Sequence, residues 1–468
     1  MNRNGPGLTG SAVLSRQLQL DDDFRIRGAL PIRIAFVSTC PPRQCGIATF
    51  TSDLARSILA TDASATVSWA AIDKPWPAHD YGAEVRWRIE QGDPASYRAV
   101  AEQLTASNVD VVAIQHEFGL YGTENYGFVD HLEPFFDALS KPVVTTLHTV
   151  LPKPHSSHRR ALQLIGERSA AVVVMSETAW RLLVHEYGLP ENRVRVIPHG
   201  VPPIPPFDRD GAKAKLGLEG RKVVATFGLV DPRKGLGYAI RAMQPVAERH
   251  PEALYLILGR THPEFVRAWG ESYRDELAML VESLGLSEHV RFIDRYLAQE
   301  DIVAYLRATD VYVTPYLNPN QITSGTQAYA LGAGRAIVST PYLHAAEVLA
   351  EGRGILVEFR SEKALAEGVN RVLGDSRLRS ELERSAYDYG RHTAWPMIAR
   401  RTLNLYREVT GQSSLALHGA RAPYPMTGQR WRQPRSEPQA DGGFSAAGLA
   451  AVERSRPLAR DTRMESPR

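Results

Sequence analysis

The sequence predicts an α/β protein built from two Rossmann-like domains that face each other across a central cleft. Short apolar runs alternate with amphipathic helical patterns along most of the chain. These runs are apolar throughout, as expected for strands of a parallel sheet that is buried on both faces. A proline-rich segment divides the alternation into two series of similar size. A chain of 468 residues is long enough for two such domains.

The first series begins at Ile32, after an arm of residues 1–30 that is rich in Gly, Asn, Ser and Asp and that we expect to be mobile. It predicts a domain over residues 31–202. The predicted strands are Ile34–Ser38, Thr66–Ile72, Val109–Ile114, Val143–Leu147 and Ala171–Met175. The predicted helices are Thr49–Leu59, Ser96–Leu104, Phe128–Leu139, one that begins at Ser157, and one that is capped by Ser176 and ends by Gly188.

Four prolines between Pro202 and Pro206 predict a linker, because proline lacks the N–H group that a helix or a central strand needs. A second domain follows over residues 203–390. Its predicted strands are Val223–Phe227, Leu254–Leu258, Val290–Ile293, Val311–Val313, Ala336–Ser339 and Ile355–Val357. Its predicted helices are Gly237–Arg249, Glu264–Leu284, Glu300–Ala308, Thr326–Leu331, His344–Leu349, Glu362–Leu373 and Ser376–Tyr389.

The end of the chain divides into a C-terminal helix, Pro396–Tyr406 within residues 391–410, and a tail of residues 411–468. The tail is rich in Ser, Pro, Arg, Gly and Gln and has few large apolar residues, which predicts disorder.

Composition narrows the class of function. The formal net charge of +3 is small, and the nine arginines against five acidic residues after Thr410 leave the body almost neutral, so a nucleic-acid partner is not expected. The sequence has no apolar run of about 18 residues and no apolar N-terminal leader, which argues against a transmembrane segment. Cys40 and Cys45 are its two cysteines, and such sparse use is typical of a reducing, cytoplasmic environment. No metal site is expected.

The segment Pro315–Gly352 is the strongest candidate for a binding site. It joins a strand end to a polar loop with Thr323, Ser324 and Gly325, and the loop leads into a helix of small residues. The free N–H groups and the positive end of a helix attract an anion at such a place. An ordinary strand-to-helix connection has the same appearance, so this segment alone does not decide between them.

Two further segments are informative: Val194–Val201, which reads Val-Arg-Val-Ile-Pro-His-Gly-Val, and Val224–Gly235, which reads Val-Ala-Thr-Phe-Gly-Leu-Val-Asp-Pro-Arg-Lys-Gly. Together with Pro315–Gly352 and the two-domain pattern, they make the chain from Ile32 to Tyr406 resemble glycosyltransferase family 4. The resemblance implies the GT-B fold, with an acceptor domain followed by a donor domain. It also implies a retaining, metal-independent transfer of mannose or glucose from GDP-mannose or UDP-glucose to a carbohydrate or small-molecule acceptor.

The resemblance also implies roles for several residues. Gly46 lies in the loop after the first strand, which approaches the donor phosphates, and His148 occupies the strand end where family members place a histidine against the donor sugar. The turn from Gly228 is expected to hold the donor diphosphate through Lys234, which matches the family's lysine, and Arg233 is expected to supply the charge of the arginine that Leu229 replaces. Structural roles for these residues are the alternative.

This chain departs from the family pattern at three positions. Leu229 stands where an arginine is usual, and Gln321 and Tyr329 stand at the two places of a glutamate pair that contacts the sugar and the ribose. Gln321 keeps the ability to bond sugar hydroxyls, whereas Tyr329 lacks a carboxylate for a ribose diol. Glu347 fits a further acidic position of the donor site, or else caps a helix.

These departures leave two other functions open. A sugar phosphorylase of the same fold would place free phosphate or a sugar phosphate in the anion site, and Tyr329 favours it. A non-catalytic sugar- or nucleotide-binding protein would have lost its reacting groups, as Leu229, Gln321 and Tyr329 together suggest.

Overall fold

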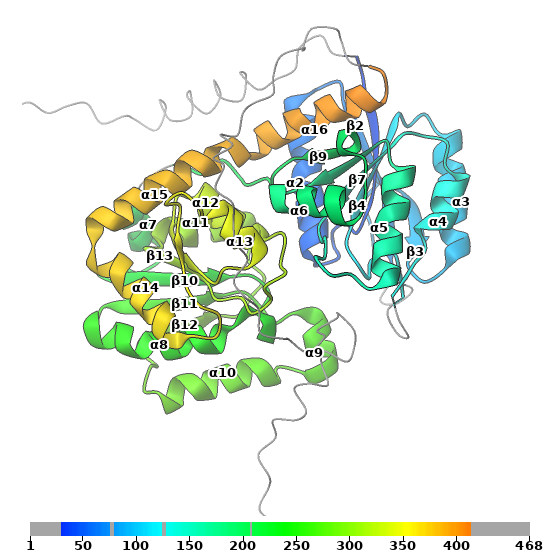
Figure 1. Ribbon diagram of the computed structural model, residues 1–468. Helices are drawn as coiled ribbons and strands as arrows, with labels where there is room; N and C mark the ends of the chain where they lie inside the picture. Colours follow the sequence, from blue (N-terminus) through cyan, green and yellow to red (C-terminus); the bar gives the residue numbers. More distant parts are fainter. Residues whose placement is uncertain (1–29, 75–78, 124–127, 206–207, 413–468) are drawn as a thin grey trace, which may run out of the picture.

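The computed structural model describes residues 30–74, 79–123, 128–205 and 208–412. The predictions for the N-terminal arm and for most of the C-terminal tail lie outside these residues. In the described part, two parallel sheets of seven and six strands each carry helices on both faces (Figure 1). The predicted α/β class and the division into two Rossmann-like units are therefore confirmed.

The first sheet has the strand order β3-β2-β1-β4-β7-β8-β9, all parallel. Its strands are β1 Arg33–Ser38, β2 Thr66–Asp73, β3 Val85–Glu90, β4 Val111–His116, β7 Val143–Leu147, β8 Ala171–Val174 and β9 Val194–Val196. Its helices are α2 Gly46–Thr61, α3 Pro94–Ala106, α4 Leu132–Ala138, α5 Ser156–Arg168 and α6 Glu177–Arg181. A short antiparallel hairpin, β5 Gly122–Thr123 and β6 Val129–Asp130, follows β4.

Strand β1 shows why the predicted runs are apolar at every position. Ile34 and Phe36 pack with α2 on one face of the sheet, and Ala35 and Val37 pack with α3, α4 and α5 on the other. Alternate strand residues point to opposite faces, so a strand that is covered on both sides needs apolar residues throughout.

The second sheet has the order β12-β11-β10-β13-β14-β15 and is also parallel. Its strands are β10 Lys222–Phe227, β11 Ala253–Leu258, β12 Val290–Ile293, β13 Val311–Thr314, β14 Ala336–Ser339 and β15 Ile355–Leu356. Its helices are α7 Arg209–Lys215, α8 Leu236–Arg249, α9 Pro263–Trp269, α10 Ser272–Ser283, α11 Gln299–Ala308, α12 Gly325–Gly332, α13 Leu343–Val348, α14 Glu362–Gly374 and α15 Ser376–Gly390.

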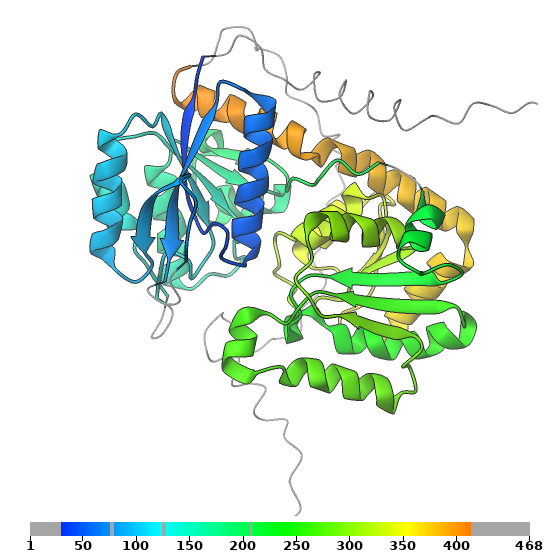
Figure 2. The same cartoon turned by 180° about the vertical axis from the view of Figure 1, so that it is seen from behind.

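The last helix, α16 Trp395–Val409, leaves the second domain and packs on the first. Trp395, Leu403 and Tyr406 share a buried cluster with Phe36 and Phe50. Both views show α16 reaching from α15 back across to α2 (Figures 1 and 2). The chain therefore crosses between the domains twice, once after β9 and once before α16.

Two predicted elements were wrong in detail, and strand β3 was among the elements not predicted. The single helix Glu264–Leu284 is two helices, α9 and α10, because Gly270 adopts a left-handed φ of 63° between them. The helix expected to begin at Phe128 begins at Leu132, after β6. Strand β3 was missed, because it lies at the sheet edge and alternates Val85, Trp87 and Ile89 with charged residues.

Candidate functional site

Loops after the carboxyl ends of strands in the two sheets contact each other. Arg260, after β11, donates a 2.8 Å hydrogen bond from Nη1 to Oε1 of Gln44, which lies in the loop after β1. The hydroxyls of Tyr296, after β12, and Thr49, in the first turn of α2, lie 3.0 Å apart. Ligand sites of open parallel sheets form at this edge, so a ligand site is expected at the interface between the domains.

The turn from Gly228 to Gly235 is shaped by glycine. Gly235 has a φ of 65°, and a Cβ on it would lie 2.1 Å from the carbonyl oxygen of Pro315. The N–H of Leu317 donates to the carbonyl of Arg233 at 2.9 Å. This turn and the loop after β13 are therefore held together backbone to backbone, which no side chain at position 235 would allow.

Lys234 lies next to the first turn of α12. Its Nζ atom is 4.0 Å from the centroid of the Tyr316 ring, and the Tyr316 hydroxyl is 2.6 Å from Oγ1 of Thr326. Ser324 caps the helix, since its Oγ accepts from the N–H of Gln327 at 3.3 Å. Within the described residues the Lys234 ammonium has no carboxylate in an ion pair, so it adds positive charge beside a helix N-terminus.

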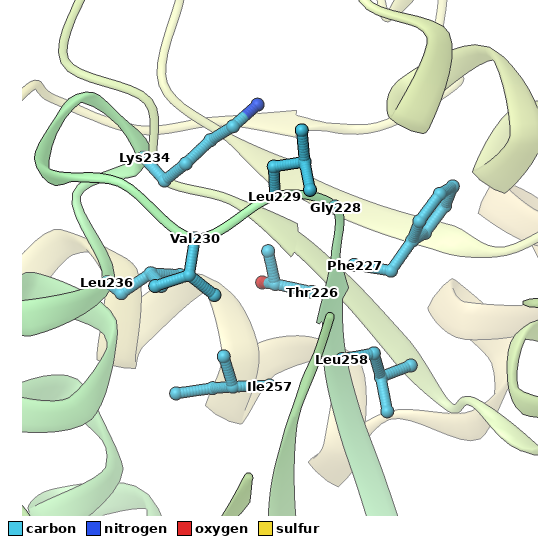
Figure 3. Close-up of a pocket in the computed structure, with 9 residues that line it drawn as sticks. All are labelled: Thr226, Phe227, Gly228, Leu229, Val230, Lys234, Leu236, Ile257 and Leu258. Carbon is cyan, nitrogen blue, oxygen red and sulfur yellow. The ribbon is translucent and has the colours of Figure 1, made fainter. Parts of the chain in front are cut away.

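A small pocket lies beneath the same turn (Figure 3). It is lined mainly by apolar side chains, among them Val230, Leu236, Ile257 and Leu258. The side chains of Leu229 and Lys234 extend from the turn on the side away from these residues (Figure 3). Arg233 is half-exposed and bonds both carboxylate oxygens of Asp231 at 3.0 Å. The Lys234 side chain thus carries positive charge to the side of the turn that faces away from the apolar residues.

The loop of the predicted anion site is ordered by its own polar groups. Nε2 of the Gln321 side chain donates to the backbone carbonyl of Thr323 at 3.1 Å. The backbone carbonyl of Gln321 accepts from the N–H of His344 at 3.0 Å. These contacts leave Oε1 of Gln321 as an acceptor and hold Thr323, Ser324 and Gly325 at the start of α12. The predicted loop residues and Lys234 therefore do come together.

In the first domain, His148 follows β7 and is 7% exposed. Its Nε2 lies 3.0 Å from Oε1 of Gln115, which ends the neighbouring strand β4, so Nε2 carries the proton. Burial and the nearby imidazoles of His199 and His116 lower the His148 pKa to about 3, which keeps the ring neutral. Gln115 was not predicted as a site residue, although its place at an adjacent strand end could have indicated it.

Gly46 is the first residue of α2, at the same edge of the first sheet. The helix is capped by Cys45, whose Sγ accepts from the N–H of Ala48 at 3.3 Å. A Cβ on Gly46 would meet nothing within 4 Å, so the structure leaves open space in front of this helix start.

Tyr329 and Glu347 lie on the second domain but contact the first. The Tyr329 hydroxyl donates to Oδ2 of Asp53 on α2 at 3.3 Å. Nε2 of Gln299 donates to the Tyr329 hydroxyl oxygen at 3.0 Å and to Oδ2 of Asp53 at 3.2 Å. The Glu347 carboxylate accepts from the N–H groups of Glu177 and Thr178, at 2.9 and 2.8 Å. Both residues therefore join the domains in this arrangement, and their predicted contacts with a sugar donor stay predictions.

Replacing Tyr329 with phenylalanine is expected to lower the free energy of unfolding by about 1–2 kcal/mol, because a buried hydrogen bond to a carboxylate is lost. Urea denaturation would measure the change. Tyr296→Phe is the matched control: Tyr296 also bonds across the domains, but it is 42% exposed against 7% for Tyr329. Equal effects of the two variants would contradict the importance of the buried Asp53 contact.

No group of three or more His, Cys, Asp or Glu side chains in the described residues is arranged to hold a metal ion. No helix in the described part is both long and apolar enough to cross a membrane.

Comparison with known protein families agrees with this geometry. Residues 208–389 match the model of the family "Glycosyl transferases group 1", and residues 46–203 match that of "Glycosyltransferase Family 4". Each matched range is therefore similar to a glycosyltransferase domain. Residues 208–389 contain all strands of the second sheet, and residues 46–203 contain the strands of the first sheet except β1.

A curated relative is the D-inositol 3-phosphate glycosyltransferase of Corynebacterium efficiens, which is 28% identical over 287 residues. The match covers 58% of this chain and 66% of the relative, so it spans just under two thirds of that protein's length.

Solved glycosyltransferase structures share the fold, which confirms the predicted GT-B architecture. Sucrose-phosphate synthase from Thermosynechococcus elongatus superimposes with a TM-score of 0.66 at 18% identity, over 82% of this chain and all of that one. Anabaena HepE, in complex with UDP and glucose, gives a TM-score of 0.62 at 17% identity, over 81% of this chain and all of that one.

Proposed function

We propose that this protein is a retaining glycosyltransferase, which transfers a hexose from a nucleotide sugar to a carbohydrate or small-molecule acceptor without a metal ion. The observation that carries the proposal is the Lys234 ammonium beside the capped N-terminus of α12, where the loops of the two domains meet. Two independent sources of positive potential at one point suit a diphosphate.

In the proposed reaction, the bond between the anomeric carbon and the phosphate oxygen breaks. The acceptor oxygen then bonds to the same carbon from the same face. Negative charge grows on the departing phosphate, and Lys234 and the N–H groups of residues 323–325 stabilise it there. The proton of the acceptor hydroxyl passes to the phosphate, so the reaction needs no pair of catalytic carboxylates of the kind that glycosidases use.

The first domain would hold the acceptor and one side of the sugar. His148 is neutral, with its proton on Nε2 directed to Gln115, and this leaves the Nδ1 lone pair as an acceptor. Gly46 and the start of α2 contribute N–H groups and open space at the same edge. Gln321, Arg233 and the loop residues 323–325 complete the proposed donor site from the second domain.

The donor is proposed to be UDP-glucose or GDP-mannose. Anabaena HepE, of the same fold, is seen with UDP and glucose, which supports the first choice. A relative that is named for glycosyl transfer to D-inositol 3-phosphate supports a polyol or carbohydrate acceptor.

A thermal-shift screen tests the proposal. A ligand at a hundred times its dissociation constant stabilises the folded state by about 2.7 kcal/mol, so UDP-glucose or GDP-mannose is expected to raise the melting temperature. UDP and GDP alone are expected to act in the same direction, and inorganic phosphate is expected to have little effect. Absence of a shift with every nucleotide would overturn the proposal.

One observation favours a sugar phosphorylase as a second candidate. Tyr329 stands where the resembling family uses a carboxylate on the ribose, and its hydroxyl bonds Asp53 and Gln299 instead. Stabilisation by phosphate or a sugar phosphate, without any effect of nucleotides, would decide for this candidate. Binding of nucleotide sugars without transfer to any acceptor or to water would instead indicate a non-catalytic binding protein.

A further inference from the structure

His199 lies in the segment that crosses between the domains after β9. Its Nδ1 donates to the carbonyl of Gly200 at 2.7 Å, which leaves the Nε2 lone pair free to accept a hydrogen bond. The ring packs in edge contact against Phe50, with 5.0 Å between centroids, and it lies near Trp395 and Tyr329. These aromatic neighbours fix the direction in which the imidazole points.

Nε2 of His199 points at the first residue of α12. A Cβ on Gly325 would lie 2.8 Å from Nε2, closer than real Cβ atoms come to another heavy atom. Gly325 is therefore the residue that lets the imidazole edge approach the helix start. Burial and the nearby imidazole of His344 lower the His199 pKa to about 4, so the ring is neutral near pH 7 and acts as an acceptor.

Asp53, Glu117 and Glu347 are carboxylates that already accept hydrogen bonds from protein groups. Asp53 accepts from Tyr329 and Gln299, and Glu117 accepts from its neighbour's N–H and from Thr149. Glu347 accepts from two N–H groups of the first domain. Sugar hydroxyls carry protons that need acceptors, and in the described residues His199 offers a lone pair directly at the helix start.

His148 lies close to His199. Its ring also contacts Phe50 edge-on, at 4.8 Å between centroids, and its pKa is lowered in part by His199. The two imidazoles therefore flank one phenylalanine, with His199 on the side of α12. A sugar whose phosphate lies at the N-terminus of α12 would meet both rings.

We propose that His199 binds the transferred sugar directly, with Nε2 accepting the proton of one sugar hydroxyl beside the N-terminus of α12. The inference rests on the proposed function, since it requires a nucleotide sugar in this site. It adds a specificity-determining residue from the segment Val194–Val201.

The test compares three substitutions by calorimetric titration with UDP-glucose, GDP-mannose and the matching bare nucleotides. Glutamine can place its side-chain oxygen near the position of Nε2, whereas asparagine is one bond shorter and phenylalanine has no acceptor. For the donor that binds, His199→Phe and His199→Asn are expected to weaken the nucleotide sugar about tenfold, and His199→Gln by much less. The affinity for the bare nucleotide is expected to stay the same in all three variants.

Deoxy analogues of the donor sugar make the test independent of packing. The wild-type protein is expected to bind one deoxy sugar nucleotide about tenfold more weakly than the parent compound, and His199→Phe is expected to bind the two equally. A packing role alone would leave the discrimination intact. Unchanged discrimination at every hydroxyl in His199→Phe would overturn the inference.

Gly325→Ala provides a second variant that leaves His199 in place. The added Cβ displaces the imidazole edge, so the same loss of sugar affinity is expected. Gly374→Ala is the matched control, because a Cβ there meets nothing within 4 Å. Failure of the wild-type protein to bind any nucleotide sugar would refute the proposed function. If the wild-type protein binds a nucleotide sugar and the variants bind it equally well, only the role of His199 is refuted.

Discussion

Lys234→Ala is expected to lower the turnover number about a hundredfold or more with the nucleotide sugar and acceptor at saturation. The Lys234 side chain extends from the Gly228–Gly235 turn on the side away from the apolar pocket, beside Tyr316, and removal of one well-placed group that stabilises developing charge typically costs about 3–4 kcal/mol of barrier. Steady-state kinetics would measure the loss. The Michaelis constant of the sugar donor is expected to change less than the turnover number, because the charge on the phosphate grows in the transition state.

Lys222→Ala is the matched control for this variant. Lys222 begins β10, the strand that ends just before the turn, and it pairs with Glu252 at 2.8 Å on the surface. Loss of such a pair costs less than about 1 kcal/mol of stability and leaves the far edge of the sheet unchanged. Turnover of Lys234→Ala within a few-fold of the wild type would remove Lys234 from the proposed role.

Lowering the pH from 7 to about 5 is expected to destabilise the fold by up to about 4 kcal/mol through His148 and His344. The pKa of His148 is lowered to about 3 and that of His344 to about 4, in both cases first by burial. Below the ordinary histidine pKa of 6.5 the unfolded chain takes up one proton at each of these two positions that the folded chain does not bind, and His199, whose pKa is also lowered to about 4, adds to the same loss of stability. Each such proton removes about 1.4 kcal/mol per pH unit, so stability is complete above pH 6.5 and falls below it.

Urea denaturation at several pH values would measure this slope. His344→Asn is expected to reduce the slope by about one proton, because the variant has no imidazole to charge at that position. His344 bonds Oε1 of Gln327 through Nδ1 at 3.2 Å, and the asparagine amide can place an N–H near the position of Nδ1. A free energy of unfolding that does not vary between pH 7 and 5 would contradict the neutral, buried state of both rings.

Much of the fold was predictable because its signals are local. The uniformly apolar runs at β1, β4, β7, β10 and β11 mark strands that are covered on both faces, whatever packs on them. Ser176 was expected to cap a helix, and its Oγ does accept from the N–H of Ala179. Strand β3 carries a charged residue at every second position, so its pattern did not stand out from a loop. The sequence pattern does not reveal the helix break at Gly270, because apolar residues continue with helical spacing on both sides.

The sequence by itself determined the two sheets, the turn that presents Lys234 and the loop that begins α12. Each of these depends on residues a few positions apart: Gly235 for the turn, Ser324 for the helix cap and Gly325 for the helix start. Only the tertiary structure decided which residues make contacts between the two domains. Asp53 and Tyr329 are 276 residues apart, and His199 meets Gly325 through a crossing segment. Such contacts depend on how two rigid units pack, and no local pattern of residue types records that packing.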